Sequence, residues 1–215
     1  MIILFAIAAV VGYILGSLPF GYLVARANGV DIFKEGSCNP GATNVKRVLG
    51  AKAGNTVYIL DALKGVVAAG WPFAICFLFM RPGPATPPYD ELCSRASMLG
   101  VTGLVAAVFG HSFSCFTRFK GGKGVATASG GLLVLVPVPG LVAISVWLVT
   151  FLATRYVSLA SILSAVSVLT TVWLLDFQAA LKIVATVLAL LVIARHAANI
   201  RRLLNGTEHR WTRKQ

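Results

Sequence analysis

Long apolar runs separated by short polar stretches dominate the pattern of this chain. Four runs are close to or above the ~20 residues that a helix needs to cross a bilayer, and they predict transmembrane helices. They cover Ile2–Ala25, Ala53–Met80, Val157–Leu175 and Ala179–Ala194. The first run has no basic residues before it and no convincing cleavage site, so we expect a retained span rather than a signal peptide.

Two further segments complete the set of candidate spans. Ala96–Phe113 is apolar and contains small residues such as Gly100 and Gly103, which suit close packing between membrane helices. Val125–Ala153 is long for one span and short for two, and a Pro/Gly cluster lies near its middle, at residues 136–140. This segment is either one long kinked helix or two shorter helices joined at that cluster.

The distribution of charge favours two helices in this segment. The chain then has seven spans, and most of its 19 lysines and arginines fall on one side of the membrane. With a single helix, the basic C-terminal tail would move to the opposite side. We therefore expect an all-α integral membrane protein with seven transmembrane helices, the N-terminus outside and the C-terminus in the cytoplasm. Residues 1–215 would form a single polytopic membrane domain with motif-bearing cytoplasmic loops.

The composition agrees with a membrane protein and limits the chemistry. Hydrophobic residues make up 57% of the chain and charged residues 12%, a balance that a soluble domain of this length rarely has. The net charge of +12 would suggest nucleic acid in a soluble protein, but here it follows the membrane topology, and we expect no nucleic-acid partner. Because the chain lacks HExxH, His-x4-Asp, CxxC and acidic-cluster patterns, we expect neither a metal nor a cofactor.

The first predicted cytoplasmic loop has the residue types of an oxyanion site. Gly36–Arg47 combines glycines, hydroxyls, carboxamides and two cations. Small residues let the backbone approach a ligand, and an arginine can bind an oxyanion through two parallel hydrogen bonds. The alternative is a turn followed by an N-capped interfacial helix. The candidate residues in this loop are Ser37, Asn39, Gly41, Thr43, Asn44 and Arg47.

The second loop, Phe119–Thr127, has a more specific pattern. Its glycines offer backbone N–H groups, the helix that follows adds its positive N-terminal end, and two lysines add full charge, which together favour phosphate. The spacing is not that of a nucleotide P-loop. A basic loop that touches lipid headgroups is the competing interpretation, but it needs lysines and not glycines. The candidate residues are Lys120, Gly121, Gly122, Lys123 and Gly124.

Polar residues also gather at the cytoplasmic end of the last span. His196 and Asn199 are three residues apart and share a helix face, and Arg201 and Glu208 follow closely. This spacing predicts a third polar cluster at the same membrane boundary.

Charged and polar residues occur within the spans as well. Asp61 and Lys64 share a face of the second span, and we interpret them as a mutual ion pair, although intramembrane charges also mark substrate paths. Ser161 belongs to a weaker polar group at the start of the sixth span, together with Arg155 and Ser158.

Three segments in this order resemble the bacterial acyl-phosphate:glycerol-3-phosphate acyltransferases, the PlsY family. They are Leu15–Gly21 with Gly36–Val45, Gly110–His111 with Phe119–Thr127, and His196 through Asn199–Leu203 to Glu208. Their order, their spacing and the seven-span frame agree, so the resemblance covers essentially the whole chain. Two positions depart from the family: Cys38 stands where glycine is usual, and His209 follows Glu208 where proline is common.

The resemblance implies transfer of a fatty acyl group from acyl phosphate to the sn-1 hydroxyl of glycerol 3-phosphate. The products would be lysophosphatidic acid and inorganic phosphate, in a committed step of bacterial phospholipid synthesis. The active site would face the cytoplasm at the bacterial inner membrane, with membrane lipids as the remaining partners. We expect a monomer that works without a cofactor.

The resemblance also implies a role for each candidate residue. We expect the catalytic set to be Ser37, Arg47, Lys123, His196 and Asn199. The last four would hold glycerol 3-phosphate, helped by Ser161. The loop Ser37–Asn44 and the three glycines of the second loop would hold the acyl phosphate and stabilise charge on its leaving phosphate. Glu208 and Lys120 are expected among the substrate-binding residues. The general base is either His196 or a phosphate oxygen of the donor.

A small transporter of an organic phosphate is the competing hypothesis. It explains the membrane spans and the basic loops. It does not explain why the polar motifs gather on one face, and we find no internal repeat of the kind that many transporters have. A lipid phosphotransferase would need a carboxylate cluster for a metal ion, which the sequence lacks.

Overall fold

The structure, a computed structural model, describes residues 2–79 and 89–212, and that part of the chain is helical and contains no strand. The expected all-α architecture is confirmed there. The helices are α1 (Ile2–Ser17), α2 (Phe20–Ala27), α3 (Ala42–Leu49), α4 (Ala51–Phe79), α5 (Tyr89–Ser112), the 3₁₀ turn η1 (Cys115–Thr117), α6 (Val125–Leu135), α7 (Pro137–Thr154), α8 (Val157–Leu174), α9 (Ala179–Arg195) and α10 (Ala197–Leu204).

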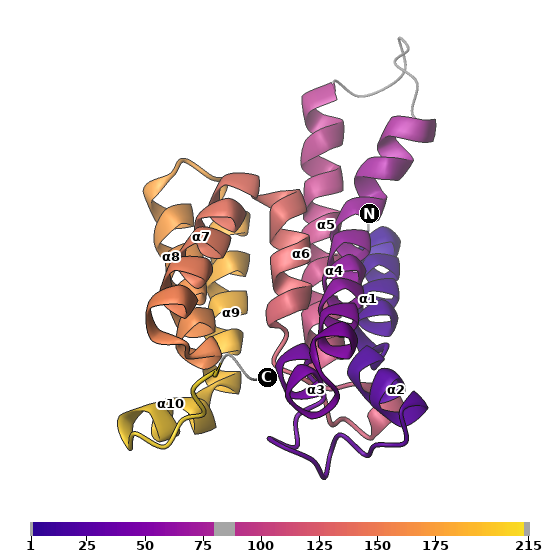
Figure 1. The fold of residues 1–215 in the computed structure, drawn as a ribbon. Helices are drawn as coiled ribbons and strands as arrows, with labels where there is room; N and C mark the ends of the chain where they lie inside the picture. Colours follow the sequence, from indigo (N-terminus) through magenta and orange to yellow (C-terminus); the bar gives the residue numbers. More distant parts are fainter. Residues whose placement is uncertain (1, 80–88, 213–215) are drawn as a thin grey trace.

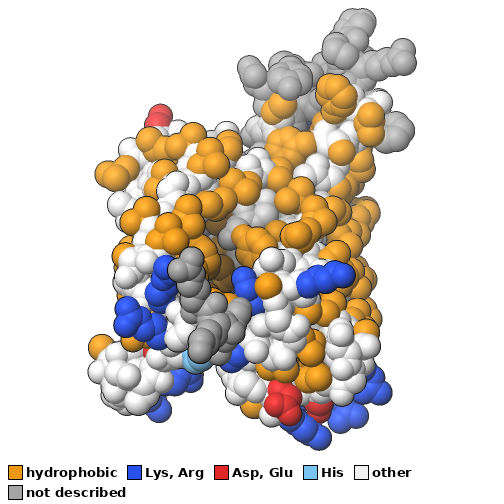
Figure 2. Space-filling view, in the orientation of Figure 1, with side chains coloured by type: hydrophobic (Ala, Val, Ile, Leu, Met, Phe, Trp, Pro, Cys, Tyr) orange, Lys and Arg blue, Asp and Glu red, His pale blue; other side chains and the backbone are white. Residues whose placement is uncertain are grey.

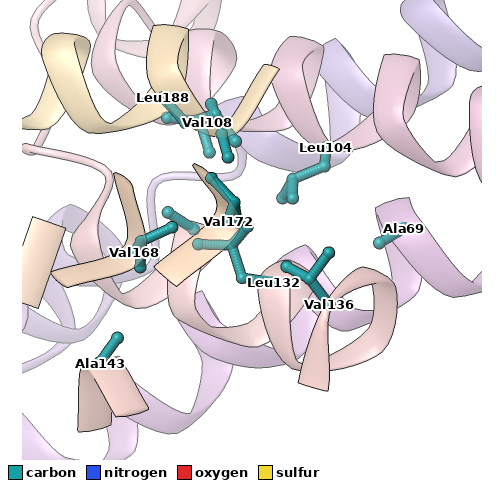
Figure 3. Packing of buried hydrophobic residues seen from close by; sticks show 11 residues of the cluster. Ala69, Leu104, Val108, Leu132, Val136, Ala143, Val168, Val172 and Leu188 are labelled. Carbon is teal, nitrogen blue, oxygen red and sulfur yellow. The ribbon is translucent and has the colours of Figure 1, made fainter. Parts of the chain in front are cut away.

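The long helices form two groups, which stand side by side in Figure 1. In one group, α1 packs on α5, and α4 packs on α5 and α6. In the other, α8 packs between α7 and α9. The sequential link between the groups is the junction of α6 and α7. The apolar core crosses this boundary, because side chains such as Leu104, Leu132, Val172 and Leu188 meet in one cluster (Figure 3).

Two helices occupy the ambiguous segment Val125–Ala153, as the charge distribution predicted. The chain breaks at Val136, which has extended backbone angles, and α7 begins at Pro137. Proline cannot donate the N–H that would continue α6, whereas it is well tolerated in the first turn of a new helix. The Pro/Gly cluster therefore ends one helix and starts the next.

Five helical segments are long and apolar enough to cross a membrane within the described residues. They are Ile2–Ala27, Ala51–Leu78, Cys93–Thr117, Pro137–Thr154 and Val157–Leu174. A sixth is obtained if α9 and α10, which meet at an angle of 57°, count as one bent span. Helix α6 is apolar but has only 11 residues. Seven crossings therefore stay a prediction.

Small residues allow the helices of the first group to approach closely. A Cβ atom on Gly16 of α1 would lie 2.0 Å from the Ala107 carbonyl oxygen of α5, so no side chain fits at this crossing. Close backbone approach at small residues is the usual way in which membrane helices pack.

The polar motifs lie together at one end of the bundle. Helices α2, α3 and α10 all lie at the lower end of Figure 1. In Figure 2, lysine and arginine side chains gather at that end, while hydrophobic side chains cover the upper part of the same face. This division is the one expected of a protein with an apolar belt for lipid and a polar end for water.

Candidate active site

Lys123 lies at the centre of the polar end, in the loop just before α6. Its Nζ atom donates a hydrogen bond of 2.5 Å to Oδ1 of Asn199 on α10. These two residues are 76 positions apart in the chain. The second and third sequence motifs therefore meet in space.

Glu208 organises the residues around this contact. Its Oε1 accepts hydrogen bonds from Asn199 Nδ2 at 2.7 Å and Ser158 Oγ at 2.8 Å, and its Oε2 accepts from Arg202 Nε at 2.7 Å. Partial burial raises the pKa of Glu208, but these three hydrogen bonds outweigh that effect, so the pKa lies below its ordinary value. Glu208 is thus an ionised acceptor whose two oxygens are occupied.

Positive charge is in excess around Lys123. The pKa of its ammonium group is lowered to about 8, mainly by burial. The charge of Glu208 opposes this shift, and the charges of Arg202, Arg47 and Arg195 add to it. Three arginines thus act on Lys123 beside a single carboxylate. Such a surplus, in a partly desolvated position, favours binding of an anion.

Asn44 holds the first loop in shape. This buried carboxamide accepts hydrogen bonds at Oδ1 from the Ser37 backbone N–H at 2.8 Å and from Arg47 Nη1 at 3.1 Å. Its Nδ2 donates to the Glu35 carbonyl oxygen at 2.9 Å. Gly36 leaves room for this arrangement, because a Cβ atom there would lie 2.4 Å from Asn44 Oδ1. Asn44 therefore fixes Ser37 and Arg47 relative to each other.

The other candidates of the first two loops make fewer contacts. Asn39 Oδ1 accepts from the Gly41 N–H at 2.9 Å and so shapes the turn before α3. Thr43 is half-buried in α3 and Lys120 is exposed. Among the described residues, no hydrogen bond joins the side chain of Thr43 or Lys120 to the cluster around Lys123.

The glycine loop presents fewer free N–H groups than its sequence suggests. The Gly122 N–H donates to the His111 carbonyl oxygen at 3.0 Å, so it is not available to a ligand. The N–H groups of Lys123, Gly124 and Val125, in contrast, have no acceptor within the described residues. They belong to the N-terminal end of α6, where free N–H groups and the helix dipole favour an anion.

His196 lies at the junction of α9 and α10 and is 2% exposed. Its Nδ1 is 2.7 Å from the Val192 carbonyl oxygen. A carbonyl can only accept, so we assign the proton of the neutral ring to Nδ1, which leaves a lone pair on Nε2. This atom can accept a hydrogen bond from a hydroxyl.

Ser161 lies on the path from the polar end into the apolar interior. Its hydroxyl donates to the Val157 carbonyl oxygen at 2.9 Å and accepts from Trp147 Nε1 at 3.2 Å. Ser161 also lines a cavity of about 40 Å³ whose other walls include Leu132 and Val192. The cavity lies between α6, α7, α8 and α9 and is mostly apolar.

The buried charges of α4 are paired as predicted. Lys64 Nζ is 2.8 Å from Asp61 Oδ1, and both side chains are 3% exposed. Lys64 also donates to the Leu18 carbonyl oxygen at 3.0 Å, and His111 Nδ1 lies 3.6 Å from the same Asp61 oxygen. The pair thus connects three segments of the first helix group.

The sequence of the chain matches a known family along nearly its whole length. The model of the family described as glycerol-3-phosphate acyltransferase matches residues 6–206. The chain belongs to the glycerol-3-phosphate acyltransferase family.

Curated members of the glycerol-3-phosphate acyltransferase family have similar length and sequence. The glycerol-3-phosphate acyltransferase of Aquifex aeolicus is 41% identical, over 93% of this chain and 95% of the relative. That of Chlorobium phaeobacteroides is 39% identical, over 98% and 97% of the two chains.

Solved structures agree with the fold. A crystal structure of PlsY, an integral membrane glycerol 3-phosphate acyltransferase, in its glycerol 3-phosphate form superposes with a TM-score of 0.83 at 38% identity. The match covers 97% of this chain and 96% of that one. The lysophosphatidic acid form of PlsY superposes with a TM-score of 0.80. The similarity supports a multi-pass membrane protein.

Two residues of this family member take part in the site although sequence reasoning gave them no role. Arg195 Nη2 donates to the carbonyl oxygens of Gly121 at 3.1 Å and Gly122 at 3.0 Å, and the His111 carbonyl oxygen holds the same loop. Both contacts are to backbone atoms, which residue types and spacing do not reveal. The one available signal was their position, since His111 belongs to the second motif and Arg195 directly precedes the third.

Proposed function

We propose that this protein transfers an acyl group from acyl phosphate to the sn-1 hydroxyl of glycerol 3-phosphate. The products are lysophosphatidic acid and inorganic phosphate. The observation that carries the proposal is the excess of positive charge around Lys123, next to an apolar cavity. Relatives named glycerol-3-phosphate acyltransferase, and PlsY structures in glycerol 3-phosphate and lysophosphatidic acid forms, support the choice of acceptor and product.

Two phosphates need two sets of donors. The side chains of Arg47, Lys123, His196 and Asn199 bind glycerol 3-phosphate in our proposal, and Glu208 supports them by orienting Asn199. A carboxylate repels phosphate, so Glu208 acts through its neighbours and not by contact with substrate. The acyl phosphate is bound by the loop Ser37–Asn44 and by the free N–H groups at the start of α6.

The chemistry needs little activation, because acyl phosphate is already a mixed anhydride. The acceptor hydroxyl attacks the acyl carbon, the bond between that carbon and the phosphate oxygen breaks, and phosphate leaves with the electron pair. Positive charge and N–H groups around the leaving oxygen stabilise the transition state. The hydroxyl proton passes to a phosphate oxygen or to Nε2 of His196, whose lone pair suits this role.

The apolar cavity gives the acyl chain an entry point between the helices in our proposal. It is lined by Ser161 and Val192, near the polar end, and by Leu132 and Leu188 farther into the bundle. Its volume of about 40 Å³ is close to that of a single water molecule in the liquid. The helices around it therefore have to separate when a long chain binds, and the carbonyl carbon of the chain then lies at the polar end.

The arrangement of the helices supports seven crossings at the bacterial inner membrane. In Figure 1, α1 runs down to α2 at the lower end, where α10 also lies, which is consistent with an odd number of crossings. The number of crossings is seven if the short helix α6 is counted as one of them. The basic end then faces the cytoplasm, and the site is complete within one chain, consistent with a monomer.

The direct test uses purified protein in detergent with palmitoyl phosphate and glycerol 3-phosphate, and it follows phosphate release and lipid product. We expect release that requires both substrates and that yields 1-acyl-glycerol 3-phosphate. Palmitoyl-CoA in place of the phosphate tests the donor. Lack of turnover, combined with uptake of glycerol phosphate into liposomes, would replace the enzyme by a transporter.

A further inference from the structure

Arg195 binds the glycine loop from the opposite helix group. It ends α9, while the loop connects α5 to α6. Its Nη2 atom donates to the carbonyl oxygens of Gly121 and Gly122 at 3.1 Å and 3.0 Å, with the Ser112 oxygen at 3.5 Å. The guanidinium also lies 5.1 Å from the ring centre of Phe113. Arg195 thereby joins the two groups of helices directly beneath the site.

The direction of these hydrogen bonds determines which N–H groups remain free. In a planar trans peptide, the carbonyl and the N–H of the next residue point in opposite directions. The peptide between Gly121 and Gly122 is held at both ends, by Arg195 at its oxygen and by the His111 oxygen at its N–H. In the next peptide, Arg195 holds the Gly122 oxygen, so the Lys123 N–H points away from Arg195.

We propose that Arg195 is a positioning residue, which sets the orientation of the glycine loop so that the Lys123 N–H and the start of α6 face the phosphate of the acyl donor. Arg195 binds no substrate in this arrangement. The inference rests on the function proposed above and deepens it.

The glycines fit this role because the loop is pressed against α5. A Cβ atom on Gly121 would lie 2.1 Å from the His111 oxygen, and one on Gly122 would lie 2.1 Å from the His111 ring. Side chains at these positions would push the loop off His111 and turn the peptides that Arg195 holds. The two glycines therefore serve loop geometry, and the phosphate contacts come from the residues that follow them.

The test compares Arg195→Ala and Arg195→Lys with the wild type, and measures kcat and the KM of each substrate separately. We expect Arg195→Ala to lower kcat/KM for acyl phosphate by about 10-fold to 100-fold, as loss of an organised anion-binding group does. The KM for glycerol 3-phosphate should stay within about twofold. Lysine should recover part of the loss, because it restores the charge and a donor but not the planar group that lies over Phe113.

Arg26→Ala is the matched control, since it removes the same charge from an exposed position on α2. We expect wild-type kinetics from it. If Arg195→Ala does not fold, Gly122→Ala disturbs the same peptide from the His111 side and should give the same pattern. The double variant Arg195→Lys/Gly122→Ala should then lose less activity than the two single losses combined, because both act on one loop.

Other outcomes would overturn the inference. Wild-type kinetics in Arg195→Ala would remove any role in catalysis. A rise in the KM for glycerol 3-phosphate alone would make Arg195 a direct ligand of the acceptor, and an equal rise for both substrates together with a lower Tm would make it a purely structural residue. Failure of the wild type itself to use acyl phosphate would instead refute the proposed function.

Discussion

Lys123 titrates at an accessible pH because the pKa of its ammonium group is lowered to about 8, mainly by burial. The ammonium is present below this pH and is lost above it. The second pKa of a phosphate monoester is about 6, so the charge of glycerol 3-phosphate changes little in this range. We therefore expect kcat/KM for glycerol 3-phosphate to fall as the pH rises from 7 to 9.5, with a midpoint near the pKa of the free enzyme.

Two variants of Lys123 provide the controls. Arginine does not lose its proton in this range, so Lys123→Arg should remove the alkaline fall while keeping part of the activity. Lys123→Ala should weaken binding of glycerol 3-phosphate by about 2 kcal/mol, roughly thirtyfold in Kd. Unchanged affinity in Lys123→Ala would show that this lysine does not hold the acceptor.

Cys38 adopts a backbone conformation that side chains disfavour. Its φ angle is +56°, in the left-handed region, where a side chain costs about 1 kcal/mol or more relative to glycine. We expect Cys38→Gly to keep the activity and to leave Tm equal or slightly higher. Cys38→Val should lower Tm, because a β-branched side chain is least tolerated there. Thermal melts of the wild type and the two variants give the three Tm values. A higher Tm for Cys38→Val than for the wild type would contradict the predicted strain at this position.

Substitutions at close contacts between helices should also change the stability of the protein. Helices α4 and α6 meet at Gly65, where a Cβ atom would lie 2.0 Å from the Thr127 carbonyl oxygen. A backbone atom cannot move aside easily, so Gly65→Ala should destabilise the protein by about 1–3 kcal/mol. It should also lower activity, since α6 carries the N–H groups that we propose to bind phosphate. Thermal stability in detergent and kcat measure the two effects.

Gly70 is the matched control on the same helix. A Cβ atom there would lie 3.8 Å from Val134 Cγ1, an ordinary contact. Gly70→Ala should therefore be neutral, or stabilising by up to about 1 kcal/mol through helix propensity. Equal losses in the two variants would mean that the α4–α6 crossing is not as close as described.

Local chemistry explains which elements could be predicted from the sequence. The break at Val136 was predictable, because the prolines beside it and the charge balance both require it. The bend of 57° at His196 was not, since no proline or glycine marks it. The meeting of Lys123 and Asn199 was predictable from their side chains and their positions near helix ends. Arg195 was missed because it acts on carbonyl oxygens that every residue has.

The topology of the whole molecule leads to one further prediction, which is the side of the membrane on which each end of the chain lies. With an odd number of crossings, the start of α1 and the end of α10 lie on opposite sides. Ile2 and Leu204 are 86% and 82% exposed, so the protein itself does not cover them. Each lies at the end of a helix, and we therefore expect a cysteine at either position to meet a reagent from its own side. The four natural cysteines are first replaced, with Cys38→Gly and serine or alanine at the other positions, and activity is checked.

A membrane-impermeant maleimide then distinguishes the two ends in right-side-out and inverted vesicles. We expect Ile2→Cys to react only in right-side-out vesicles and Leu204→Cys only in inverted ones, because in our proposal the basic end faces the cytoplasm. A permeant maleimide should label both variants in both preparations, which controls for reactivity. Restoring the exposed natural Cys38 alone should reproduce the Leu204→Cys pattern, since the first loop lies at the same end as α10. Labelling of Ile2→Cys and Leu204→Cys from the same side would require an even number of crossings, and α6 would then not be a span.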